Sequence, residues 1–352
     1  MESTKQNQTV KPQSFAEFRQ SSRLQVTDEF LSPPVILKVD DSVVGTLGNF
    51  SASTGKAKSK KTFNICAIVA SALRNETVLN YSVSLPGDKR KILYADTEQS
   101  KFHCHKVLKR ILQLAFLPLD KQPETLEFLS LRKYCPKVRL GIIEEAINHS
   151  EGLGLVIIDG IRDLAYDINS PSEATDLITK LMQWSDEKQI HIHTVLHLNK
   201  GDDNTRGHLG TELNNKAETV LQITKDEFDK DISSVTSSFI RDIDFDPFAF
   251  RINDKGLPEL IEDYQPKQTV SQKGFDYQEV PEAKHREALE NLFSEAEQVS
   301  YNSLINKLQK SYLTVGYSFG TNKAKLLKMF LENKRMIVKD GKSYRFNPDF
   351  HF

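Results

Sequence analysis

Length, composition and charge place the chain among ordinary globular proteins. Its 352 residues are enough for two or three domains, one of them with a sizeable core. A hydrophobic share of 38% and a charged share of 27% exclude a disordered or fibrous protein. Because the formal net charge is −1, any affinity for nucleic acid has to come from a local basic surface.

The cysteines and the apolar runs indicate a compartment. Cys66, Cys104 and Cys135 form a sparse, odd set, which argues against a disulfide framework and favours a reducing environment. The opening MESTKQNQTVKPQSF lacks the apolar stretch of a secretory signal. The most apolar runs, at 65–73 and 155–158, are too short to cross a bilayer. We therefore expect a cytoplasmic protein without a membrane partner.

The first segment, 1–34, is rich in Gln, Ser, Thr and Lys, and we expect a flexible lead-in. One short helix is predicted at 15–20. Pro33 and Pro34 then precede an apolar run at 35–37, which we interpret as an edge strand.

Between 35 and 261, short apolar runs alternate with segments of helical length. Predicted strands lie at 44–47, 92–95, 126–129, 155–158, 191–196 and 219–223. Predicted helices lie at 62–74, 103–117, 137–149 and 173–188. This alternation predicts one α/β domain with a mostly parallel sheet and helices on both faces. The runs at 235–241 and 248–252 follow without helices, which predicts antiparallel strands at one edge of the sheet.

Polar residues without periodicity fill 262–280, which we interpret as a linker, and a further domain is expected at 281–352. Helices are predicted at 282–297, after a cap at Ser300, and at 321–333. Residues 336–346 are predicted to form a hairpin around Asp340 and Gly341. Three helices followed by a hairpin predict a winged-helix domain.

Basic residues dominate the end of this domain. From 300 to 346 there are ten Lys or Arg and two acids, an excess that favours salt-dependent binding to DNA phosphates. The third helix is expected in the major groove and the hairpin on the backbone. The candidate DNA-binding residues are Lys323, Lys325, Lys328, Lys342 and Arg345. The alternative is a domain used for protein contact or for packing in a ring.

The central motif follows the predicted strand at 44–47 and precedes the apolar helix FNICAIVASAL. The pattern G-x-x-x-x-G-K-[ST] describes a phosphate-binding loop, and here its second glycine is replaced by Lys60. The candidate nucleotide-binding residues are Gly55, Lys56, Ala57, Lys58, Ser59, Lys60, Lys61 and Thr62.

Such a loop turns its backbone N–H groups toward phosphate oxygens, and the helix N-terminus that follows adds partial positive charge. Lys61 is expected on the β- and γ-phosphates of ATP, and the Thr62 hydroxyl on Mg²⁺. If the position of Lys60 requires a positive φ, a side chain there costs on the order of 1–2 kcal/mol. The alternative is a solvated basic loop in a Lys-rich stretch.

Two later strands end in carboxylates. LVIID closes on Asp159, the arrangement in which an aspartate holds Mg²⁺. ILYADTE supplies Glu98 as the candidate base that activates water, with Asp96 as the second candidate for this catalytic base. The alternative for either of these two acids is a helix cap or a surface charge.

A fourth strand ends at VLHLNK and is followed by a Gly-rich polar segment. His197 is a candidate sensor of the γ-phosphate, and Arg206 a candidate arginine finger for a neighbouring subunit. The alternatives are a structural histidine and a solvated loop charge.

The ordered set GKAKSKKT, YADTE, LVIIDG and VLHLNK…RGHLGTEL resembles the RecA-like ATPases related to plasmid RepA-type replicative helicases, over 35–260. It looks closest to versions carried by mobilizable elements of Bacteroidetes-type bacteria. The resemblance implies a RecA-like core, ATP and Mg²⁺, a homo-oligomeric ring or filament, and action on DNA with replication proteins as candidate partners. It also makes 207–212 a candidate DNA-facing loop.

Three hypotheses follow. The first is a DNA-dependent ATPase that helps to replicate or mobilise an element. The second is a regulatory DNA-binding protein that binds nucleotide but turns it over very slowly, which the departure at Lys60 motivates. The third is an assembly module without nucleotide chemistry.

Overall fold

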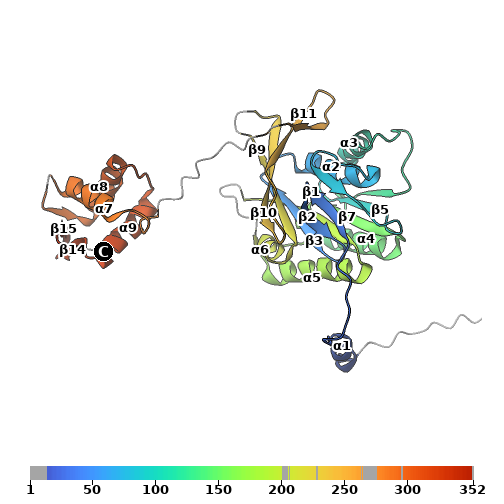
Figure 1. Ribbon diagram of the computed structural model, residues 1–352, viewed down its shortest axis with the longest axis horizontal. Helices are drawn as coiled ribbons and strands as arrows, with labels where there is room; N and C mark the ends of the chain where they lie inside the picture. Colours follow the sequence, from blue (N-terminus) through green and yellow to red (C-terminus); the bar gives the residue numbers. More distant parts are fainter. Residues whose placement is uncertain are drawn as a thin grey trace, which may run out of the picture. The chain divides into compact units, whose positions relative to one another are not determined.

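The chain divides into two compact units, Met1–Gln265 and Pro266–Phe352 (Figure 1). The computed structural model describes residues 14–199, 205, 207–226, 229–262, 264, 276–294 and 296–350. Among these residues, no helix is long and apolar enough to cross a membrane.

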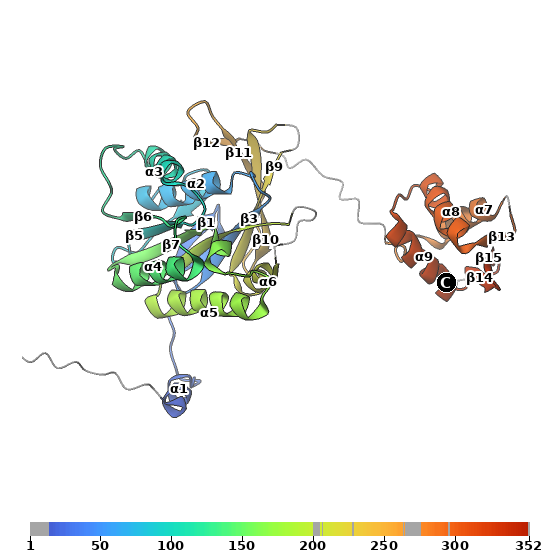
Figure 2. The same ribbon diagram turned by 180° about the vertical axis from the view of Figure 1, so that it is seen from behind.

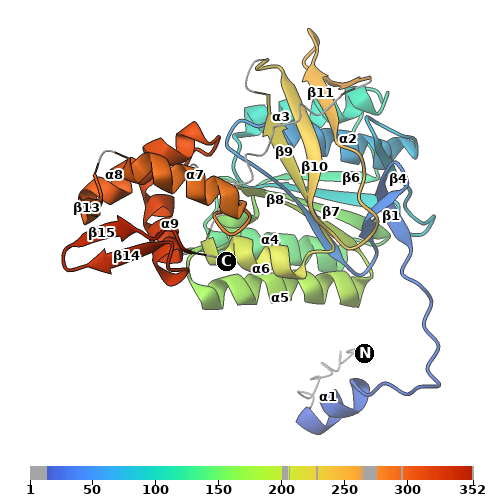
Figure 3. The ribbon, with the colours of Figure 1, turned by 60° about the vertical axis from the view of Figure 1, so that its left-hand side comes forward.

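A large mixed sheet organises the first unit. Within the described residues it has nine strands in the order β12-β11-β10-β9-β3-β8-β7-β5-β6. The strands are β3 (Phe50–Gly55), β5 (Lys91–Asp96), β6 (Leu126–Ser130), β7 (Leu153–Asp159), β8 (His191–His197), β9 (Thr219–Lys225), β10 (Ile232–Ile240), β11 (Phe248–Ile252) and β12 (Pro258–Ile261). From the edge strand β6 through β5, β7, β8 and β3 to β9, each strand is parallel to its neighbour. From β9 through β10 and β11 to β12, each strand is antiparallel to its neighbour. Figure 3 shows β9, β10 and β11 side by side. The α/β class and the antiparallel edge are confirmed.

Helices cover both faces of this sheet. Figures 1 and 2 show these helices on opposite sides of the sheet. They are α2 (Lys61–Arg74) and α3 (Lys101–Leu114), opposite α4 (Pro136–His149), α5 (Pro171–Lys188) and α6 (Gly207–Lys216). Side chains of β7 alternate between the two hydrophobic clusters, with Leu155 and Ile157 in one and Val156 and Ile158 in the other. Burial on both faces explains why this strand is an unbroken apolar run.

The strand that leads into the phosphate-binding loop was predicted wrongly. The run at 44–47 belongs to β2 (Ser42–Thr46), in a separate small sheet with β1 (Val35–Val39) and β4 (Tyr81–Val83). In that sheet β1 lies in the centre, so the predicted edge strand is also wrong. The loop instead follows β3, whose sequence FSASTG is too polar to signal a buried strand, although all of its residues are buried.

A chain of hydrogen bonds explains the polar interior of β3. Ser51 Oγ lies 2.7 Å from His191 Nε2 and 2.7 Å from His193 Nδ1, and Ser53 Oγ lies 2.8 Å from His193 Nε2. His191 Nδ1 lies 2.9 Å from the Thr46 carbonyl, which only accepts, so this nitrogen carries the proton. Burial lowers the pKa of His191 to about 4 and that of His193 to about 3, so both rings are neutral. Donor and acceptor therefore alternate along the chain without a gap.

A second correction concerns the predicted DNA-facing loop. Residues 207–212 lie in α6, where Leu209 and Leu213 are buried one helical turn apart. Gly207, at φ 73°, starts the helix in a conformation that favours glycine. The glycines of this stretch hid the helix in the sequence. Arg206 lies outside the described residues.

The second unit contains the predicted helices and hairpin. Its elements are α7 (Glu282–Phe293), β13 (Gln298–Ser300), α8 (Tyr301–Thr314), α9 (Thr321–Asn333), β14 (Ile337–Asp340) and β15 (Ser343–Phe346). In the described residues the strands form a small sheet in the order β13-β15-β14. Leu289, Leu308 and Leu327 place one side chain from each helix in a common core. Ser300 occupies the N-cap position of α8, but its side chain makes no capping hydrogen bond.

Candidate active site

The loop between β3 and α2 has the shape that phosphate binding requires. A Cβ on Gly55 would lie 2.3 Å from the Ile223 carbonyl oxygen, so only glycine fits at this first position. Lys58 and Lys60 have φ values of 66° and 67°, in the left-handed region. The position that normally holds the second glycine thus does need a positive φ, and Lys60 adopts it at a cost on the order of 1–2 kcal/mol.

Two side chains of the loop are turned into it. Lys61 is buried, and its ammonium donates to the carbonyls of Gly55 at 2.8 Å and Lys56 at 2.9 Å. Burial lowers the pKa of Lys61 to about 8. The buried Ser59 hydroxyl has no hydrogen-bond partner among the described residues. An inward cation and an unsatisfied hydroxyl fit a bound phosphate.

The hydroxyl of Thr62 and the carboxylate of Asp159 meet beside the loop. Thr62 Oγ1 donates to Asp159 Oδ2 at 3.0 Å, and the Tyr94 hydroxyl donates to the same oxygen at 2.8 Å. Burial, and then the nearby Asp96 charge, raise the pKa of Asp159 to about 6. A hydroxyl and a carboxylate in contact offer the hard oxygen ligands that Mg²⁺ prefers. These residues fit the ion, and Tyr94 is a member of the site that sequence reasoning missed.

Glu98 and His197 form a pair across the site. His197 Nε2 lies 3.2 Å from Glu98 Oε1, although 99 positions separate the two residues. The hydrogen bond from His197 lowers the pKa of Glu98, which keeps the carboxylate ionised. An ionised glutamate at this place can accept a proton from water.

Asp96 has a different place from the one predicted. Its carboxylate is fully buried and accepts from the backbone N–H of Glu98 at 3.0 Å and of Gln99 at 2.7 Å. Burial raises its pKa. It does not line the cavity that Glu98 faces. The Asp96 side chain therefore shapes the turn that carries Glu98.

A cavity of about 320 Å³ collects these groups at the carboxyl ends of the parallel strands, where α/β proteins bind ligands. Its lining includes Lys58, Ser59, Lys60, Lys61, Thr62, Glu98, Asp159 and His197. Sequence reasoning missed His103, Lys106 and Arg110 of α3, which line the same cavity. These three residues follow one another at intervals of three and four positions, which places them on one face of a helix, and this spacing was the available signal.

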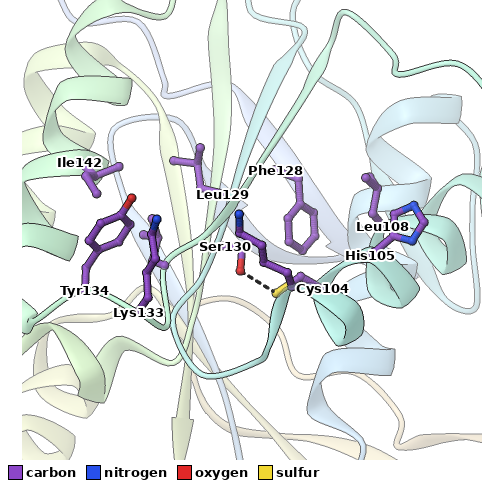
Figure 4. A pocket seen from close by; sticks show the side chains of 11 residues that line it. Cys104, His105, Leu108, Phe128, Leu129, Ser130, Lys133, Tyr134 and Ile142 are labelled. Carbon is purple, nitrogen blue, oxygen red and sulfur yellow. Dashed lines mark hydrogen bonds between the residues drawn. The ribbon is translucent and has the colours of Figure 1, made fainter.

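A larger cavity, of about 430 Å³, lies beside the edge strand β6, away from the loop (Figure 4). Figure 4 shows Cys104 and Ser130 at its centre, with Cys104 Sγ 3.4 Å from Ser130 Oγ. None of the motif residues lines it. The smaller cavity is the better candidate because several charged groups converge there.

Most of the candidate DNA-binding residues of the second unit are exposed. On α9, Lys323 and Lys325 are exposed, and Lys342 and Arg345 are exposed on the hairpin. Lys328 is different. Its ammonium makes an ion pair with Glu332 and lies 4.8 Å from the centre of the Tyr344 ring.

A loop of this shape between a central parallel strand and a helix, with a hydroxyl–carboxylate pair and a glutamate beside it, is typical of nucleoside triphosphatases of the P-loop class. The chain belongs to the family described as AAA domain, whose model matches residues 18–203, more than half of the chain.

One solved structure with similarity is the crystal structure of the RadB recombinase, at 13% identity and a TM-score of 0.42. The match covers 60% of this chain and 90% of that one. No curated protein matches the sequence.

Proposed function

We propose that the protein hydrolyses ATP with Mg²⁺ and couples this reaction to DNA. One observation carries the proposal: Lys61, the Thr62–Asp159 pair and the Glu98–His197 pair line one cavity. A cation for phosphates, oxygens for a metal and a base for water are the three requirements of phosphoryl transfer to water.

Each group then has a role. Lys61 exchanges the two loop carbonyls for phosphate oxygens, while Thr62 and Asp159 hold Mg²⁺. The ion, when bound, neutralises charge on the phosphates. Glu98 orients the attacking water and accepts its proton, and His197 holds Glu98 in place. We propose His197 as the residue that detects a change at the γ-phosphate through this contact.

We further propose that residues 35–261 form a RecA-like ATPase domain, that 262–280 is a linker, and that 281–352 is a winged-helix domain that binds DNA. The strand order of the sheet supports the first assignment, because β8 separates the loop strand β3 from the metal strand β7. The exposed Lys323, Lys325, Lys342 and Arg345 support the last. The order of motifs favours a role in replicating or mobilising a genetic element, alongside replication proteins.

Assembly into a homo-oligomer is also proposed. Residues 14–34 are exposed throughout and carry large apolar side chains. These are Phe15, Phe18, Leu24, Val26, Phe30 and Leu31. We propose that this segment of one copy docks at the β6 cavity of the next. The acidic Asp28 and Glu29 beside Phe30 complement Lys101 and Lys133 of that cavity. In solution with ATP, the wild-type protein should have the mass of an oligomer, and the Phe30→Asp variant should have the mass of one chain.

The central test compares the ATPase rate of the wild-type protein and Lys61→Ala, with and without single- and double-stranded DNA. We expect turnover that DNA stimulates and that Lys61→Ala abolishes. A purified, folded wild-type protein that neither binds nor hydrolyses ATP would exclude the proposal.

The second candidate is a regulatory DNA-binding protein that holds ATP and turns it over very slowly. The strained conformation of Lys60 favours it, because strain in the loop weakens the cradle. Under this alternative, Glu98→Gln changes the low rate little. A DNA-stimulated rate that collapses in Glu98→Gln would exclude it.

A further inference from the structure

The side chain that replaces the second glycine of the loop has a specific partner. Lys60 Nζ donates to the backbone carbonyl of Lys230 at 2.5 Å. Lys230 lies in the turn between β9 and β10, and 170 positions separate the two residues. Burial lowers the pKa of Lys60 and the charge of Lys225 adds to that shift, while the charges of Asp231 and Asp229 oppose it. The ammonium therefore lies in a mostly acidic turn.

The same hairpin also meets the other end of the loop. Strand β9 pairs with β3, and the Ile223 carbonyl of β9 is the atom that a Cβ on Gly55 would strike. The phosphate-binding loop is thus fixed to the β9–β10 hairpin at its first residue through close packing. At its sixth residue it is fixed through the hydrogen bond of Lys60.

The backbone at Lys60 gives a reason to look for a role. A glycine would adopt φ 67° without strain, whereas a lysine is strained there. The Lys60 side chain makes a hydrogen bond to the Lys230 carbonyl, which a glycine at this position could not make. Lys60 also lines the cavity proposed for the nucleotide. A phosphate bound there would compete with the neutral Lys230 carbonyl for the Lys60 ammonium.

We propose that Lys60 is a positioning residue that ties the loop to the β9–β10 hairpin while the cavity is empty, and that a bound nucleoside triphosphate releases it. This rests on the proposed nucleotide binding. An ionised phosphate oxygen is a stronger acceptor for an ammonium than a backbone carbonyl. The phosphates therefore draw Lys60 away from Lys230, and the hairpin loosens. Occupancy of the cavity is in this way transmitted to the antiparallel edge of the sheet.

Amide hydrogen exchange of residues 229–240 in the full-length protein tests the proposal. The variants are Lys60→Met, which keeps the strain and removes the charge, and Lys60→Arg, which keeps a donor. Lys58→Met is the matched control, because Lys58 is another loop lysine at positive φ that lines the cavity. Each is measured alone and with Mg²⁺ and a non-hydrolysable ATP analogue.

Without nucleotide, Lys60→Met should exchange about three- to tenfold faster than the wild type in this segment, with Lys60→Arg and Lys58→Met unchanged. The analogue should accelerate the wild type by a similar factor and Lys60→Met no further. Lys60→Gly, which loses both the strain and the tether, should exchange as fast as Lys60→Met in the absence of nucleotide.

Equal exchange of nucleotide-free wild type and Lys60→Met would overturn the proposal. So would an acceleration by the analogue that persists in Lys60→Met. If fluorescent ATP does not bind the wild-type protein, that result excludes the proposed ATPase function. The contact between Lys60 and the hairpin is tested separately, by the exchange rates of the wild type and Lys60→Met without nucleotide.

Discussion

Strands β3 and β8, together with the loop that follows β3, carry two polar clusters, and these differ in one main respect. In the middle of the strands, each buried nitrogen and hydroxyl of Ser51, His191 and His193 has a partner. At the carboxyl ends, Ser59 Oγ and His197 Nδ1 are buried without a partner among the described residues. The two clusters share serine and histidine, although the His197 side chain is 30% exposed whereas His191 and His193 are fully buried.

A buried polar atom without a partner costs stability, and the fold retains it where something outside the chain can satisfy it. The complete cluster is therefore part of the core, whereas Ser59 and His197 line the cavity, where a ligand can satisfy their unpartnered atoms. On this comparison, changes in the middle of the strands should affect stability alone. Changes at their ends should affect nucleotide chemistry.

The largest effect is expected from Glu98→Gln, at the ligand end. Loss of the base should lower ATP turnover by about 100-fold or more, since proton transfer by a positioned carboxylate contributes on this scale. Steady-state ATPase assays measure the rate, and fluorescent-nucleotide titration should show that affinity is retained. Glu127→Gln, at an exposed position of β6, is the control. A variant at Glu98 that keeps more than about a tenth of the wild-type rate contradicts the assignment.

The next effect concerns the complete cluster. Ser51→Ala leaves one nitrogen of His191 and one of His193 without a partner, and should lower the free energy of unfolding by about 2–4 kcal/mol. Ser53→Ala removes one hydrogen bond of this cluster, the one to His193 Nε2, and should lower the free energy of unfolding by about 1–2 kcal/mol. Urea denaturation measures both.

Nucleotide affinity of the folded Ser51→Ala protein should equal that of the wild type. A loss of affinity in Ser51→Ala would remove the distinction between the two clusters.

Asp159→Asn should stabilise the protein in the absence of Mg²⁺ and nucleotide. The pKa of Asp159 is about 6 in the fold against 3.8 ordinarily, so the folded state binds the proton more tightly. Its contribution to stability is present below pH 3.8 and is lost as the pH rises through 6. At pH 8 the asparagine should add about 1–3 kcal/mol, and near pH 4 nothing.

Chemical denaturation of both proteins across this pH range measures the difference. Asparagine keeps an oxygen for Thr62 and Tyr94, so the packing is conserved. An Asp159→Asn protein that is less stable than the wild type at pH 8 would refute the burial argument.

The smallest effect separates two lysines of α9. Lys325→Ala should weaken duplex DNA binding about three- to fivefold and reduce the salt dependence by about one phosphate contact. Lys328→Ala should change affinity less than about twofold, because its ammonium is engaged by Glu332 and Tyr344. Fluorescence anisotropy over a salt series measures both. If Lys328→Ala weakens binding more than Lys325→Ala, the exposed face of α9 that carries Lys325 is not the DNA-binding surface.

The sequence predicts those parts of the molecule whose signal is local. The apolar runs of β5 and β7 and the spacing from Gly55 to Thr62 depend on neighbouring residues, and both were found. The polar strand β3 was missed because its partners, His191 and His193, follow about 140 positions later. Helix α6 was missed because its two glycines indicate a loop, whereas the helical spacing of Leu209 and Leu213 is a weaker signal.

The candidate site divides in the same way. The residue types at Lys61, Thr62, Asp159 and Glu98 follow from motifs, but their contacts do not. The pairing of Glu98 with His197 depends on strands that become neighbours only in the sheet. Tyr94 gave no signal, because a tyrosine in an apolar strand looks like core until its hydroxyl meets Asp159.

Calorimetric titration of a non-hydrolysable ATP analogue with Mg²⁺ into the wild type and Lys61→Ala tests the central claim most directly. The cavity between the loop, Asp159 and Glu98 should bind one analogue per chain at micromolar concentration, and Lys61→Ala should lose about 100-fold or more in affinity. Wild-type protein that takes up no analogue at millimolar concentration, or Lys61→Ala that binds as tightly as the wild type, would contradict it.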